Sequence, residues 1–168
     1  TGNPIEGATV SLSDTTDMIA ITGGSLWGQM FWNGGSGQVD WENTTEYFEG
    51  DGGISTTDTP LAMRLINSGG VVLSNSGTLT SSTFDTGSEE SAYTTFNWLP
   101  ASQDPATTVK FQIATNNDNE TWNFIGPDGT SNSYYTSPGT TIGTSNNQKR
   151  YVRYKAFLST TDTSKNPT

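Results

Sequence analysis

The sequence predicts an all-β fold with no substantial helix, and three observations support this prediction. Short strand-like runs recur along the chain at intervals of roughly 8–12 residues, with turn signals between them. Gly occurs 19 times, and Thr and Ser are abundant, which favours strands and turns. No window carries apolar residues at helical spacing. Because only 30% of the residues are hydrophobic while 11% are aromatic, the core must be built from a few large rings.

The strands are expected at residues 61–66, 71–73, 77–84, 93–98, 109–114, 122–125, 134–136 and 151–158. Turn sequences such as Pro127-Asp128-Gly129 separate them. Alternation within these runs predicts that Val109, Phe111, Ile113, Phe96 and Trp98 point inward, and Trp122 is expected in the core as well. Several short, mainly antiparallel strands at this spacing are typical of a sandwich or a barrel.

The strand at 151–158 has the clearest pattern in the chain. One face carries Val152, Tyr154, Ala156 and Leu158 and is expected to be buried. The other face carries Tyr151, Arg153, Lys155 and Phe157. Five of the seven basic residues lie between positions 149 and 165 of an otherwise acidic chain. This cationic and aromatic face is therefore either matched by acidic residues inside the fold or the floor of a binding surface.

Residues 1–22 are expected to form an N-terminal strand or a linker, and residues 23–168 a single module. The sequence at 2–12, Gly-Asn-Pro-Ile-Glu-Gly-Ala-Thr-Val-Ser-Leu, resembles a strand of the carboxypeptidase-regulatory-like repeats of bacterial surface proteins. Residues 25–50 hold an aromatic group around the Gly-rich turn 33–37: Trp27, Phe31, Trp32, Trp41, Tyr47 and Phe48.

Composition excludes several classes of function. The chain has no His and no Cys, which removes the usual general bases and thiol nucleophiles. Catalysis is therefore not expected, although a carboxylate pair among Glu42, Glu46 and Glu49 is the alternative. A net charge of −10 argues against nucleic acid as a partner. No apolar run is long enough for membrane insertion, and the chain has no initiator Met or signal peptide. We expect a piece of a larger extracellular or cell-surface protein.

Five blocks of the sequence resemble galactose-binding-like (discoidin-like) jelly-roll modules of prokaryotic surface proteins and carbohydrate-binding modules. They are residues 76–87, 95–98, 109–114, 122–130 and 150–160. The resemblance implies a jelly-roll β-sandwich and neighbouring domains in a larger parent chain. The family pattern continues beyond the last Pro into another strand, so either the last family strand is missing from residues 23–168 or the sheet is completed differently.

Aromatic residues are the main candidates for ligand binding, because sugars stack their C–H faces on flat rings and need a few polar anchors. Trp32, Trp41 and Tyr47 are the stacking candidates. Tyr134 and Tyr135 are adjacent, so one of them must face outward, and Tyr135 is included among the glycan-binding residues. Gln29 and Arg153 are the polar candidates, and an ion pair of Arg153 inside the fold is the alternative.

Oxygen-rich sequences offer ligands for a structural calcium ion. The candidates are Asp118 and Glu120 in the run 116–120, for which an ordinary turn is the alternative interpretation. The function expected from the sequence is that of a non-catalytic carbohydrate-binding module with a polysaccharide or glycan partner. The alternative is a structural subunit or adhesin domain of a bacterial surface fibre.

Overall fold

The computed structural model describes residues 19–23, 49–56, 63–98 and 100–167. These residues form an all-β fold, as the sequence predicts, with one short 3-10 turn and no α-helix. The strands are β1 (Ile19–Gly23), β2 (Glu49–Gly50), β3 (Ile54–Ser55), β4 (Arg64–Leu65), β5 (Asn67–Ser68), β6 (Val71–Val72), β7 (Ser76–Thr80), β8 (Phe84–Asp85), β9 (Tyr93–Trp98), β10 (Thr107–Asn116), β11 (Thr140–Thr141) and β12 (Tyr151–Thr160), and the 3-10 turn is η2 (Thr144–Asn146).

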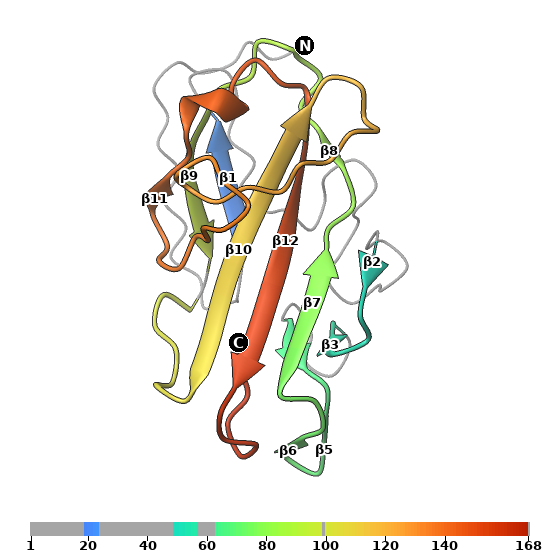
Figure 1. Cartoon of the computed structure of the whole chain (residues 1–168), viewed down its shortest axis with the longest axis vertical. Coiled ribbons are helices and arrows are strands. Elements are labelled where there is room, and N and C mark those ends of the chain that lie inside the picture. Colours follow the sequence, from blue (N-terminus) through green and yellow to red (C-terminus); the bar gives the residue numbers. More distant parts are fainter. Residues whose placement is uncertain (1–18, 24–48, 57–62, 99, 168) are drawn as a thin grey trace, which may run out of the picture.

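Two sheets contain most of the strands. The first has the order β1-β9-β11, and the second has the order β10-β12-β7-β2 with β8 also paired to β12. All pairings are antiparallel. Figure 1 shows β10 and β12 as the long central strands, with β9 and β1 toward the left of the view and β7 and β2 toward the right. The pairs β3–β4 and β5–β6 are separate two-stranded sheets.

The core lies between the two sheets, and its largest fully buried side chains are aromatic rings. Phe111 of β10 lies 5.1 Å from Phe96 and 4.9 Å from Trp98, both of β9, between ring centroids. It also meets Tyr154 of β12 edge to face at 6.1 Å. Such tilted and edge-on pairs are the favourable arrangements of aromatic rings. The predicted inward residues of β9, β10 and β12 are thereby confirmed: Phe96, Trp98, Val109, Phe111, Ile113, Val152, Tyr154, Ala156 and Leu158 are all buried.

The prediction that Tyr135 faces a ligand is wrong. Tyr135 forms an antiparallel bridge with Phe111, which directs its ring to the same, inner side of the sheet. The ring lies 5.3 Å from that of Phe96 and has no exposed surface. Burial raises the pKa of its hydroxyl to about 12. Its neighbour Tyr134 is the one that faces outward.

Two expected strands, 122–125 and 134–136, do not form as strands. Each makes a single bridge to the edge of β10, at Ile125 with Ile113 and at Tyr135 with Phe111. The segment 117–139 that holds them turns at Gly126, whose amide donates to Thr130. We call residues 117–139 the covering segment, since three of its aromatic side chains, those of Trp122, Phe124 and Tyr134, lie on the outer face of the second sheet.

The expected strand 77–84 is divided into β7 and β8 by Ser81. Its amide donates to the carbonyl of Tyr154 at 2.9 Å, while its hydroxyl accepts the amide of the same residue at 3.0 Å. The Ser81 hydroxyl thus takes the place of a backbone carbonyl as acceptor for the Tyr154 N–H, and this interrupts the strand. The segment 161–167 follows β12 and contacts β4, where the Asn166 amide group pairs with both the N–H and the C=O of Leu65.

Candidate functional site

The outer face of the second sheet carries the cationic and aromatic side chains that the sequence pattern indicated. Inner and outer residues alternate along a strand, so burial of Phe111 and Ala156 directs their neighbours outward. Lys110 of β10 is opposite Phe157 of β12, and Gln112 is opposite Lys155. We call the following set the cation–aromatic face: Lys110, Arg153, Lys155 and Phe157 of the strands with Trp122, Phe124 and Tyr134 of the covering segment.

Cations and rings alternate across this face. The ammonium group of Lys110 lies 3.8 Å from the ring centroid of Tyr134, and Tyr134 meets Phe157 edge to face at 5.1 Å. The ammonium group of Lys155 lies 5.9 Å from the rings of both Phe124 and Phe157. Apart from Arg153, which is buried, the side chains of this face are half-buried, so part of each faces solvent. The arrangement combines apolar ring surface with N–H donors, which is what a polar ligand with an apolar face requires.

Gln112 holds the covering segment in place. This side chain is 5% exposed, and its amide nitrogen donates to the carbonyls of Ser131 at 2.8 Å and Ser133 at 3.0 Å. Gly126 packs so closely against Ser133 that no larger residue fits there. Tyr134 follows Ser133 directly, so these contacts fix the position of its ring above β10.

Arg153 lies beneath Trp122 and is only 8% exposed. Its guanidinium carbon is 4.2 Å from the Trp122 ring centroid, and its Nε donates to the Thr83 hydroxyl at 2.8 Å. Burial lowers the pKa of the guanidinium. Arg153 therefore anchors the covering segment and contributes little surface to a ligand. Trp122, which the sequence placed in the core, lies half-buried on the outer face.

The two lysines lack acidic partners among the described residues. The ion pairs found in that part of the chain join Arg150 to Asp85 and Lys165 to Asp104, and no carboxylate there approaches Lys110 or Lys155 within 4.0 Å. Glu49 of β2 lies on the same row of the sheet as Lys155, and Thr80 of β7 lies between them. Two ammonium groups thus have no ion-pair partner in the described ranges, although the chain carries a net charge of −10.

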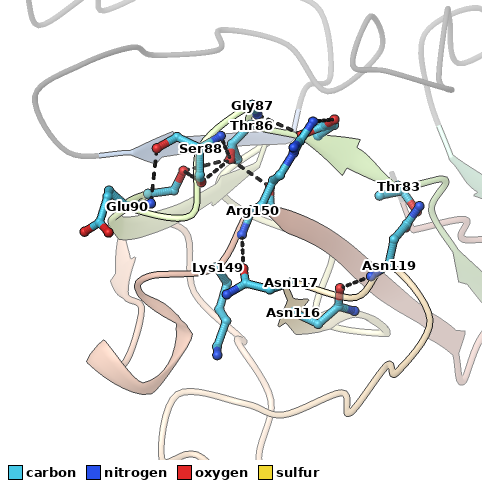
Figure 2. Close-up of polar contacts among 12 residues, drawn as sticks. Thr83, Thr86, Gly87, Ser88, Glu90, Asn116, Asn117, Asn119, Lys149 and Arg150 are labelled. Atoms are coloured by element: carbon cyan, nitrogen blue, oxygen red, sulfur yellow. Dashed lines mark hydrogen bonds and ion pairs between the residues drawn. The ribbon is translucent and has the colours of Figure 1, made fainter.

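A second polar group stabilises one end of the sheet. Arg150 forms two hydrogen bonds with the Asp85 carboxylate, at 2.7 and 2.8 Å, and its backbone N–H donates to Asn117 at 2.8 Å. Figure 2 shows Arg150 among the contacts that join the loops near Thr86 and Asn117. The hydrogen bond from Arg150 holds the pKa of Asp85 below its usual range. We call this group the loop clasp.

The calcium candidates lie in a turn beside the loop clasp. The Asp118 carboxylate accepts the backbone N–H groups of Glu120 and Thr121, both at 2.9 Å. These bonds lower the pKa of Asp118, with Thr121 as the larger contributor. Within the described ranges, no group of three or more acidic side chains converges as a metal site would require. The calcium prediction for Asp118 and Glu120 stays a prediction.

The remaining predicted site residues lie outside the described residues: Gln29, Trp32, Trp41 and Tyr47. Sequence reasoning did not select Lys110, Phe124 or Tyr134 for the site. The signal for Lys110 was present, because alternation in the run 109–114 places it opposite the core. The two aromatic residues could not be assigned to this face without knowing where the covering segment runs.

Comparison with known proteins adds no relative. No protein-family model, no curated protein and no solved structure matches the chain. Among the described residues there is also no helix with the length and apolarity needed to cross a bilayer.

Proposed function

We propose that this chain is a non-catalytic carbohydrate-binding module of jelly-roll type, part of a larger secreted or cell-surface protein. The cation–aromatic face would hold the glycan. The observation that carries the proposal is that half-buried rings share one sheet face with ammonium groups that pair with no carboxylate of the described residues. A sugar ring can place its C–H face on an exposed part of Phe157 or Tyr134 and accept hydrogen bonds from the lysines.

Affinity electrophoresis against a panel of soluble polysaccharides tests this proposal. We expect at least one polysaccharide to retard the protein, and Tyr134→Ala to reduce the retardation because it removes a ring from the face. Thr136→Ala is the matched control, since Thr136 is an exposed residue of the same segment. Circular dichroism checks that both variants fold. A chelator arm tests the calcium prediction for Asp118 and Glu120. Failure of every polysaccharide in the panel would overturn the proposal.

A structural subunit or adhesin domain of a surface fibre is the second candidate. The observation that favours it is exposed apolar surface at β6 and beyond it, where Val71 is 51% and Leu73 is 65% exposed. A partner could bury these side chains. Light scattering coupled to size exclusion separates the candidates: a fibre subunit associates with increasing concentration, and Leu73→Ser reduces that association.

A further inference from the structure

Lys110 and Lys155 flank one ring on the cation–aromatic face. Lys110 is directly opposite Phe157 in the β10–β12 ladder, and Lys155 is two residues before Phe157 on the same side of β12. The two ammonium groups each lie 5.9 Å from the centroid of the Phe157 ring. Diagonal neighbours of this kind have Cα atoms about 7–8 Å apart, within reach of each other for long side chains. Both ammonium groups therefore lie near the same aromatic ring.

In the part of the chain that the structure describes, no carboxylate pairs with either of these two lysines. Like charges on neighbouring strands destabilise a sheet, and acidic residues normally compensate them. The chain has 17 Asp and Glu residues, yet none in the described ranges lies within 4.0 Å of either ammonium group. An anion bound at these ammonium groups would receive charge-assisted hydrogen bonds, which are about twice as strong as neutral ones.

The aromatic ring restricts what kind of anion fits. A free inorganic anion gains nothing from Phe157, whose half-buried ring lies 5.9 Å from each ammonium group. A uronate residue has both parts that this arrangement can bind. Its pyranose C–H face covers the ring, and its carboxylate, attached directly to the sugar ring, extends past the rim of Phe157 toward the lysines. A neutral sugar has the same C–H face but no group that compensates the two charges.

Building on the proposed function, we propose that the ligand is an acidic polysaccharide and that Lys110 and Lys155 bind a uronate carboxylate above Phe157. Affinity should then weaken as salt concentration rises, because solvent-exposed ion pairs are screened. Tyr134, which Lys110 contacts at 3.8 Å, extends the apolar surface to a second sugar along the polymer.

Polygalacturonate and its fully methyl-esterified form provide the test, because they share one backbone and differ in charge. Retardation in affinity electrophoresis and calorimetric titration measure binding. We expect polygalacturonate to bind and its methyl ester not to bind. Lys110→Gln and Lys155→Gln should each weaken binding about tenfold, the effect of losing one charge-assisted hydrogen bond. Lys165→Gln is the matched control, since Lys165 pairs with Asp104 away from this face. Equal melting temperatures confirm that the variants fold.

Several outcomes would overturn this inference without touching the proposed function. They are equal binding of the methyl ester, binding of neutral polysaccharides alone, binding of dextran sulfate but not polygalacturonate, and unchanged binding by the double variant Lys110→Gln/Lys155→Gln. If no polysaccharide of any charge binds, the proposed function itself fails, and the inference fails with it.

Discussion

The guanidinium group of Arg153 lies over the ring of Trp122 at 4.2 Å, and this contact joins β12 to the covering segment. A second contact holds the same guanidinium group near the start of β8, because the Arg153 Nε donates to the Thr83 hydroxyl. The Thr83 hydroxyl in turn donates to the side-chain carbonyl of Asn119. Arg153 is thus shared between the sheet and two loops. A cation stacked on Trp in a desolvated setting stabilises by about 2 kcal/mol, more than at an exposed site.

Replacing the ring should therefore destabilise the fold without abolishing it. We expect Trp122→Ala to lower the free energy of unfolding by about 2–4 kcal/mol, which combines the cation–π contact with lost packing of a large ring. Trp122→Phe should cost less because it keeps a ring over the guanidinium. Urea denaturation followed by circular dichroism measures both. A Trp122→Ala protein with the midpoint of the wild type would show that Arg153 does not depend on this ring.

The faces of β10 and β12 could be predicted from the sequence because alternation is a local property of an extended strand. Phe111 and Tyr154 followed this rule and are buried, and so did Lys110 and Lys155 on the outer face. The exception is Arg153, whose outward direction is as predicted but whose guanidinium is covered. The all-β class followed from the same local patterns.

Residues of the covering segment could not be placed in the same way. Adjacency requires Tyr134 and Tyr135 to face opposite sides, but only the pairing of Tyr135 with Phe111 decides which side each takes. Trp122 has an apolar side chain suited to a core, and its partner Arg153 is distant in sequence. Contacts of this kind depend on the path of a loop over a sheet, which no local pattern encodes.

The loop clasp should make the free energy of unfolding depend on pH in the acidic range. Arg150 holds the pKa of Asp85 below its usual value, so the folded carboxylate loses its proton at lower pH than the unfolded one. The pair therefore contributes stability above the unfolded pKa of about 4, and this contribution is lost as pH falls through the folded pKa. The two side chains are 40% and 27% exposed, so solvent screening limits the contribution to about 1 kcal/mol.

Asp85→Asn tests this contribution. At pH 7 we expect the variant to be less stable than the wild type by about 1 kcal/mol, and we expect the difference to shrink as the pH is lowered below 4. Asp104→Asn is the matched control, because its contact with Lys165 is longer, at 3.6 Å, and more exposed. Denaturation midpoints at pH 7, 5 and 3 measure the effect. A difference that stays constant across this range would show that the charge of Asp85 is not the cause.

Among the glycines of the covering segment, Gly126 has the least room for a side chain, and this position gives the last prediction. A Cβ atom there would overlap with the carbonyl group and the hydroxyl of Ser133, and the backbone on both sides of the turn would have to move. Gln112 holds the carbonyl of Ser133, so that movement would also loosen Tyr134 above the sheet. We expect Gly126→Ala to destabilise the protein by about 1–3 kcal/mol, as overpacking does, and to alter the near-ultraviolet circular dichroism of the aromatic residues.

Gly143→Ala is the control. Gly143 has a φ of −61°, and a Cβ there would have ordinary contacts at 3.7 Å, so we expect no loss of stability. Equal stability of the two variants would contradict this account, because it would mean that the turn at Gly126 can shift without disturbing the segment that carries Tyr134.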